Sequence, residues 1–250
     1  MSRNLDVATS LLASTMSLWR GTMASQRSSQ PPKPIELYEF EACPFCRLVR
    51  EALTELDLDA MIYPCPSGGT RFRPKVKQMG GKQLFPYMVD PNTGTAMYES
   101  EDIINYLWRT YRGKKPRRLP RPLRVLGSGL ASAARYGRGR RARPSKAPQK
   151  PLELYSFESS PYSRLVRERL CELELPYLLR NFGKAVGPDV GPPWIRTRFF
   201  PEVPVKGRNR KRMFERTMRL QAPYLIDPNT DVGMYESAEI IAYLEQTYAA

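Results

Sequence analysis

Apolar and polar residues follow two different periods in residues 33–111. Short runs with the alternation or length of strands are separated by segments in which apolar residues recur every three or four positions, as on one helix face. Ser100, followed by two acidic residues, is a natural N-cap for the last helix. The predicted order is βαβαββα, with elements at residues 35–40, 43–56, 60–63, 73–79, 87–90, 95–98 and 100–110.

The same pattern occurs again later in the chain. The repeated pairs are residues 33–38 with 150–155, 44–58 with 161–175, and 86–111 with 223–248. The second pair shares ten of fifteen residues, and the third shares sixteen of twenty-six. The offset grows from 117 to 137 along the repeat, so the second copy carries an insertion of twenty residues between positions 181 and 219.

A weaker repeat precedes each copy. Residues 5–21 align with residues 123–139 at an offset of 118, and the shared leucine, serine and alanine positions have helical spacing. Residues 1–33 contain Arg and Ser and little acid, so a targeting peptide is an alternative interpretation. Because a cleaved peptide has no reason to recur in mid-chain, we expect a structural helix before each copy.

These patterns predict an α/β protein of two tandem domains, each preceded by a short helix. The expected segments are an N-terminal helix and linker (1–32), a first domain (33–112), a basic connector (113–149) and a second domain (150–250). The sequence contains no run of about 18 apolar residues, so no transmembrane helix is expected. Without a convincing signal, we expect a cytoplasmic location, or an organellar stroma or matrix.

Positive charge is concentrated in the connector. The net charge is +15, and residues 112–150 hold fourteen Lys or Arg and no acid. A second cluster, residues 196–219, has nine Lys or Arg against two Glu. Tyr136 is the only aromatic residue among the cations of the connector, and no nucleic-acid-binding motif appears. We therefore expect a solvated linker, with contact to an anionic membrane surface or nucleic acid as the alternative.

Four cysteines and no histidine limit the chemistry. The absence of histidine excludes Ser-His-Asp and Cys-His catalysis and any His metal site. Cys43 lies at a helix start, where free N–H groups favour a thiolate, and Arg47 and Arg50 would add positive charge. Cys46, one turn later, could resolve a mixed disulfide. A zinc half-site or an inert pair is the alternative, whereas Cys65 suits a packed loop position or a third redox thiol, and Cys171 a buried apolar one.

Three motifs carry a family resemblance. Cys43-Pro44-Phe45-Cys46 resembles the dithiol motif of glutaredoxins. Residues 85–90 resemble the segment that holds a cis-proline in the thioredoxin fold, and residues 97–107 resemble the ES-x-x-I-x-x-YL signature of glutathione S-transferase N-terminal domains. The chain as a whole is similar to tandem glutaredoxin-like proteins. The all-helical domain that completes a glutathione transferase is replaced by the second copy.

The resemblance implies a glutathione site in the first copy. Pro86 would be the cis-proline, and the backbone of Phe85 would pair with the cysteinyl part of glutathione. Glu99 and Ser100 would hold its γ-glutamyl end, a plain helix cap being the alternative. Glutaredoxins usually carry a Lys just before the cysteine motif, where this chain has Glu41 and Ala42.

The second copy has lost its thiols but keeps other parts of the pattern. The equivalent residues are Ser160, Ser163, Ala222, Pro223, Glu236 and Ser237. We expect a redox-inactive domain with a structural role. Two alternatives are binding of glutathione or a peptide without reaction, and a Ser160 that stabilises a bound thiolate as in serine-type transferases.

The predicted function is a glutathione-linked thiol–disulfide oxidoreductase. Cys43 would attack, Cys46 would resolve, and glutathione would be the co-substrate, with a protein thiol or disulfide as partner. The alternatives are a glutathione transferase-like or dehalogenase-like enzyme, and a binding scaffold with two thioredoxin-like surfaces. An iron–sulfur cluster held by Cys43 and glutathione in a dimer is a further alternative. No other metal site is expected.

Overall fold

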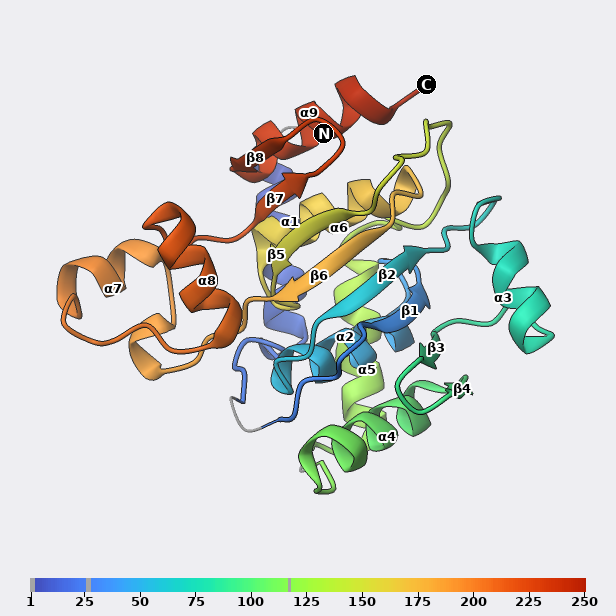
Figure 1. The fold of residues 1–250 in the computed structure, drawn as a ribbon, viewed down its shortest axis with the longest axis horizontal. Coiled ribbons are helices and arrows are strands. Elements are labelled where there is room, and N and C mark those ends of the chain that lie inside the picture. Colours follow the sequence, from blue (N-terminus) through green and yellow to red (C-terminus); the bar gives the residue numbers. More distant parts are fainter. Residues whose placement is uncertain (1–2, 26–27, 117) are drawn as a thin grey trace.

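A computed structural model describes residues 3–25, 28–116 and 118–250 (Figure 1). The remaining positions of the expected N-terminal segment and connector, 1–2, 26–27 and 117, lie outside the described residues. Within the described ranges, eight strands form one mixed sheet in the order β4-β3-β1-β2-β6-β5-β7-β8. No described helix has the length and apolar character needed to cross a membrane.

The predicted βαβαββα order is confirmed in both copies. The first consists of β1 (Ile35–Glu39), α2 (Pro44–Glu55), β2 (Ala60–Pro64), α3 (Arg73–Gly80), β3 (Tyr87–Asp90), β4 (Thr95–Met97) and α4 (Ser100–Arg112). The second consists of β5 (Leu152–Ser156), α6 (Pro161–Glu172), β6 (Tyr177–Asn181), α8 (Arg208–Thr217), β7 (Tyr224–Asp227), β8 (Val232–Tyr235) and α9 (Ser237–Tyr248). The insertion adds η1 (Gly187–Asp189) and α7 (Pro193–Phe199), which stand away from the sheet (Figure 1).

Strands β2 and β6 join the two copies edge to edge. They pair antiparallel with Met61 opposite Leu178, flanked by the pairs Ala60 with Leu179 and Ile62 with Tyr177. Residues 60–62 and 177–179 are equivalent in the repeat, so this register relates the copies by a local two-fold axis. Each copy thereby covers the other's exposed sheet edge, a site that would otherwise invite aggregation.

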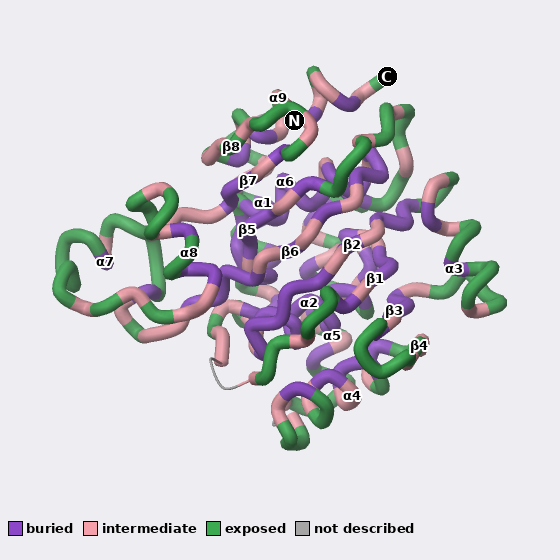
Figure 2. Tube along the Cα trace, viewed as in Figure 1, coloured by how far each residue is buried: buried purple, intermediate pink, exposed green. Residues whose placement is uncertain are grey.

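The sheet has a different core on each face. On one face, a single apolar cluster runs through both copies and includes Leu37 and Leu154, with α2, α4, α6 and α9 packed over it. The neighbouring strand residues Tyr38 and Tyr155 point to the other face. There, two smaller aromatic clusters lie under α3 and α8. Buried positions concentrate along the central strands, whereas α7 is largely exposed (Figure 2).

The helix that precedes each copy packs against the other copy. Helix α1 (Arg3–Met16) contacts α6, and α5 (Arg121–Ala133) contacts α2, while α1 and α5 also pack together. The hydroxyl of Ser10 donates to the Pro161 carbonyl at 2.7 Å, and the equivalent Ser128 donates to the Pro44 carbonyl at 2.6 Å. The expected helix before each copy is therefore confirmed, and the exchange of partners explains why small residues are shared in the upstream repeat.

The expectation of a solvated connector is wrong for α5 and the segment after it. Arg124 pairs with Glu101 at 2.7 Å, and Arg135 pairs with Glu168 at 2.7 Å. Both arginines are buried. The carboxylates that pair with these arginines lie outside the connector in the sequence. A count of charge within residues 112–150 therefore predicted a solvated basic linker.

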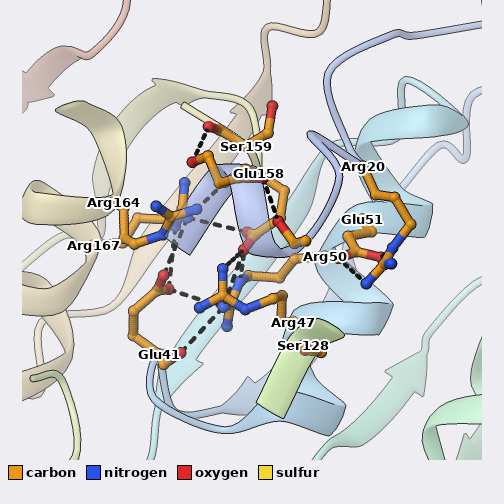
Figure 3. A network of polar contacts seen from close by, with 12 residues as sticks. Arg20, Glu41, Arg47, Arg50, Glu51, Ser128, Glu158, Ser159, Arg164 and Arg167 are labelled. Carbon is orange, nitrogen blue, oxygen red and sulfur yellow. Dashed lines mark hydrogen bonds and ion pairs between the residues drawn. The ribbon is translucent and has the colours of Figure 1, made fainter. Parts of the chain in front are cut away.

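A buried ion network lies at the local two-fold axis, where α2 and α6 meet (Figure 3). Arg50 Nε lies 2.9 Å from Glu158 of the second copy. In the reciprocal contact, Arg167 Nε and Nη2 each lie 3.1 Å from Glu41 of the first copy. We call this the interdomain network; its members are Glu39, Glu41, Arg47, Arg50, Glu158, Arg164 and Arg167.

The charges of the interdomain network depend on one another. Burial opposes ionisation of Glu158, but Arg167, Arg50 and Arg47 outweigh it and lower the pKa of this carboxyl to about 2. Burial raises the pKa of Glu39 to about 7, although Arg50 opposes the rise. A buried ion that loses its partner carries an uncompensated desolvation cost. The network therefore holds the copies in one relative orientation.

We predict that Glu158→Gln destabilises the protein by about 3–5 kcal/mol, because it leaves the arginines around it short of a counter-charge. Urea unfolding followed by circular dichroism measures the change. Arg143→Gln is the matched control, since the side chain of Arg143 is 42% exposed in its pair with Glu245 and exposed pairs contribute at most about 1 kcal/mol. Equal losses in the two variants would contradict a structural role for the network.

Candidate functional site

Cys43 is the N-cap of α2, and Pro44 is the first helical residue. Proline suits this position because its fixed φ matches the helix and its missing N–H would be unpaired there. The sulfur of Cys43 accepts a hydrogen bond from the backbone N–H of Cys46 at 3.3 Å. Cys43 is 4% exposed and Cys46 is fully buried, so solvent and substrate meet Cys43 first.

The environment of Cys43 favours its thiolate. A hydrogen bond from the Cys46 thiol lowers the pKa of Cys43, burial opposes it, and the N–H groups of Cys46 and Phe45 lower it further. Burial and the neighbouring Cys43 raise the pKa of Cys46. The two thiols are thus distinguished as expected for an attacking and a resolving cysteine.

The expected contribution of Arg47 and Arg50 to this thiolate is not found. Both lie on the face of α2 that meets the second copy, where they bind Glu158 at 3.3 and 2.9 Å. The charge that acts on Cys43 is instead the Glu39 carboxyl, which raises its pKa. Activation of Cys43 therefore depends on the helix N–H groups and on Cys46.

Phe85 and Pro86 lie beside the nucleophile. The Phe85–Pro86 peptide bond is cis, and the Phe85 carbonyl oxygen lies 3.9 Å from the Cys43 sulfur. The ring of Phe40 packs edge-on against Phe85, and the guanidinium of Arg73 lies 4.8 Å from the centre of the Phe85 ring. Two aromatic rings and one guanidinium group therefore lie on the side of Cys43 that faces Phe85.

Glu99 and Ser100 lie near Pro86 because strands β3 and β4, which follow Pro86 and precede Glu99, pair with each other. Tyr87 stacks on Tyr98 at 4.5 Å between ring centres, which brings the residues after Pro86 next to those before Glu99. The expected cap is corrected by one residue, because Glu99 is the N-cap, with φ +64°, and Ser100 is the first residue of α4. Glu99 is exposed, and its side chain makes no ion pair or hydrogen bond within the described part of the chain.

The second copy repeats this geometry without thiols. Ser160 is the N-cap of α6 and accepts a hydrogen bond from the Ser163 N–H at 3.2 Å, and the Ala222–Pro223 bond is cis. Helix α1 covers this end of α6, since Ser14 donates to the Ser159 carbonyl at 2.7 Å. Ser160 and Ser163 are buried, as are Cys43 and Cys46 at the equivalent positions.

The binding residues of the second copy also differ from those of the first. Glu236 has the same positive φ as Glu99, +64°, and Ser237 begins α9. However, the side chain of Gln221 donates to the Glu236 carboxylate at 2.5 Å. The corresponding position before Phe85 is Leu84. Glu236 is thus already engaged by its own chain, whereas Glu99 is available to a ligand.

The other two cysteines are buried away from this chemistry. Cys65 has no exposed surface, and burial raises the pKa of its thiol. Cys171 is 2% exposed, and its thiol donates to the Gly139 carbonyl at 3.2 Å. Among the described residues, no group of three or more His, Cys, Asp or Glu is arranged to hold a metal ion.

Sequence reasoning missed Arg73, Phe40 and Glu39 as neighbours of the site. Phe40 and Glu39 directly precede the cysteine motif, so their closeness in the chain was an available signal. Arg73 opens α3, twenty-seven positions after Cys46, and nothing in its surroundings distinguishes it from other surface arginines. Glu41, two positions before Cys43, belongs to the interdomain network.

The fold and the site define a tandem thioredoxin-fold protein in which one copy carries a dithiol. A model of the glutathione S-transferase N-terminal domain family matches residues 37–115 and 154–250. These segments make up more than half of the chain, and the chain therefore belongs to this family. No curated protein and no solved structure matches it.

We predict that Cys43 reacts with iodoacetamide with a pH midpoint below the ordinary thiol value of 9.0. Its folded-state pKa is lowered, so the thiolate is already present at pH values where an ordinary thiol is protonated. Cys46→Ala removes the thiol donor and should move the midpoint to higher pH, whereas Cys65→Ala should not. Mass spectrometry of the peptide that contains Cys43 gives the rates. An unchanged midpoint in Cys46→Ala would contradict this account.

Proposed function

We propose that the protein is a glutathione-linked thiol–disulfide oxidoreductase that uses the Cys43/Cys46 dithiol. The observation that carries the proposal is the difference between the two thiols, with a lowered pKa at Cys43 and a raised pKa at the buried Cys46. Membership of the glutathione S-transferase N-terminal domain family supports a glutathione-related role.

The reaction begins with a protein that carries a mixed disulfide with glutathione. The Cys43 thiolate attacks the glutathione sulfur, the protein thiolate leaves and takes up a proton, and glutathione becomes linked to Cys43. Cys46 then loses its proton and attacks the Cys43 sulfur, releasing glutathione and forming the Cys43–Cys46 disulfide. Two further glutathione molecules reduce this disulfide and leave as glutathione disulfide, so the electrons come from glutathione.

The residues around Cys43 offer polar groups that match the charged and peptide groups of glutathione. The backbone of Phe85 offers a strand-like edge for the cysteinyl part, because its carbonyl faces the Cys43 sulfur. The first turn of α4 suits the γ-glutamyl carboxylate, and the unpaired Glu99 suits its ammonium group. Arg73, above Phe85, would meet the opposite carboxylate of the tripeptide.

The small exposed area of Cys43 favours a narrow substrate. At 4% exposure, its sulfur is accessible to an extended tripeptide or a flexible chain more readily than to a folded surface. Ser160 of the second copy lacks a thiol and cannot take part in disulfide exchange. We therefore assign the second copy a structural role in this reaction.

We predict that Cys43→Ser lowers the reduction rate of a glutathionylated peptide by more than about a hundredfold, because it removes the nucleophile. Ser160→Ala, at the same position of the second copy, is the matched control and should keep the rate. Glu99→Gln should raise the KM for glutathione by about tenfold, the usual effect of losing a charged hydrogen bond. The assay follows glutathione disulfide formation through a coupled reductase.

Three results would contradict the oxidoreductase. Full activity in Cys43→Ser would show that this thiol is not the nucleophile. Steady conjugation of a model electrophile that does not need Cys46 would favour a transferase-like enzyme instead. Glutathione binding without turnover would indicate a binding scaffold.

A further inference from the structure

The insertion of the second copy forms one wall of an open cavity. The cavity has a volume of about 570 Å³ and lies between η1, α7, α8 and the segment before β7. In Figure 1 these helices form a lobe beside the sheet. We call this cavity the insertion pocket. Its wall reaches Gln221, next to the cis-proline of the second copy, but none of the residues that correspond to the cysteine motif lines it.

The buried wall of the insertion pocket carries more positive than negative charge. Lys184, Arg196 and Arg210 are all buried there, against one buried carboxylate, Asp189. Arg196 lies 2.6 Å from Asp189, and Arg210 lies 2.9 Å from the same oxygen atom. The exposed rim adds Arg219 and one carboxylate, Glu202. The lining as a whole therefore keeps a surplus of two positive charges.

Arg210 and Lys184 are only partly satisfied by the described residues. Arg210 is 2% exposed, and its Nε and Nη1 atoms have no hydrogen-bond partner among the described residues. Its guanidinium stacks on Phe182 at 4.8 Å. The Lys184 ammonium has one long hydrogen bond, 3.5 Å to the Gly191 carbonyl, and lies 5.3 Å from the centre of the Phe157 ring. Buried polar groups without hydrogen-bond partners cost free energy and are rare in folded proteins. The donor nitrogens of Arg210 that lack an acceptor therefore need an explanation.

Comparison with the first copy shows that the fold does not require this arrangement. Arg73 and Arg210 each lie three residues before the buried apolar residue of their helix, Val76 and Met213. Each also stacks on an aromatic ring at 4.8 Å. Yet Arg73 Nε donates to the Pro66 carbonyl at 2.8 Å. The repeat therefore does not require the unpaired Nε of Arg210.

The apolar part of the insertion pocket has exposed aromatic surface. Trp194 is 60% exposed and Phe200 is 41% exposed, and both line the cavity together with Phe214. Aromatic rings beside buried cations match a ligand with a flat apolar body and an anionic end. Burial, together with nearby Arg210, lowers the pKa of Lys184 to about 8, although Asp189 opposes the shift.

We propose that the insertion pocket binds a small aromatic anion, with its carboxylate or phosphate on Arg210 and Lys184 and its ring against Trp194. The acceptor oxygens of the anion satisfy the unpaired nitrogens of Arg210 and balance the surplus charge. This site is independent of the dithiol chemistry of Cys43, and it gives the second copy a binding role of its own.

Tryptophan fluorescence tests the proposal with named probes. In a full-length variant with Trp19→Phe and Trp108→Phe, Trp194 is the remaining tryptophan and reports on the pocket. Phenyl phosphate and phenylacetate are titrated to distinguish a phosphate from a carboxylate end, with benzyl alcohol as the neutral probe. At least one anion should bind below about 1 mM and at least about tenfold more tightly than the alcohol.

Charge variants locate the bound anion. Arg210→Gln should weaken binding by about tenfold or more, because it removes a charged donor. Arg216→Gln, an exposed arginine on the same helix, should leave binding unchanged. Circular dichroism checks folding, and if Arg210→Gln is misfolded, Lys184→Gln is judged by the same criterion. The proposal is overturned if neither anion binds at about 10 mM, if the alcohol binds equally well, or if a folded Arg210→Gln or Lys184→Gln binds as tightly as the parent.

Discussion

The reciprocal pairing of Arg50 with Glu158 and of Arg167 with Glu41 is the constraint on which the rest of the structure depends. Each arginine comes from one copy and each carboxylate from the other. Buried ions of this kind contribute little net stability when paired, but they are strongly unfavourable when unpaired. In either copy alone, these charges would be exposed to solvent or buried without their partners from the other copy. The two copies therefore form one folding unit, completed by the β2–β6 strand pair and the exchanged helices α1 and α5.

This docking shapes the dithiol site. The face of α2 that carries Arg47 and Arg50 is occupied by the second copy, so these arginines do not act on Cys43. Helix α5 holds the first turn of α2 through Ser128, which fixes the N–H groups around the thiol. The pKa of Cys43 is consequently set by local hydrogen bonds. In the equivalent place of the second copy, α1 covers serines, and the exposed chemistry of that copy is found in the insertion pocket.

Local features were predictable from the sequence because their causes are local. Near neighbours in the chain determine the alternation of residues 35–40, the apolar stripe of α2 and the turn after Asp90. The elements predicted from these patterns end within two residues of the observed helix and strand ends. The start of α4 at Ser100 was predicted correctly, but the N-cap is Glu99, whose positive φ ends the preceding strand, and not Ser100. The cysteine motif was likewise readable as a helix start.

Long-range features were not predictable in the same way. The shared serines at positions 10 and 128 showed that a helix precedes each copy, but not that each helix crosses to the other copy. Arg50 and Glu158 are more than one hundred positions apart, and single-sequence patterns carry no information on such pairs. The surplus charge around Arg210 depends on which carboxylates the insertion brings near, which a list of basic residues does not reveal.

Urea unfolding with one tryptophan in each copy tests directly whether the two copies unfold in a single cooperative transition. One variant keeps Trp108 on α4 of the first copy, and the other keeps Trp194 on α7 of the second, with the remaining tryptophans replaced by phenylalanine. Each transition is compared with circular dichroism of the same variant. The account predicts that the fluorescence and circular dichroism transitions coincide in both variants. Fluorescence of either tryptophan that changes at a clearly different urea concentration would show that the copies unfold separately and would contradict the central role of the interdomain network.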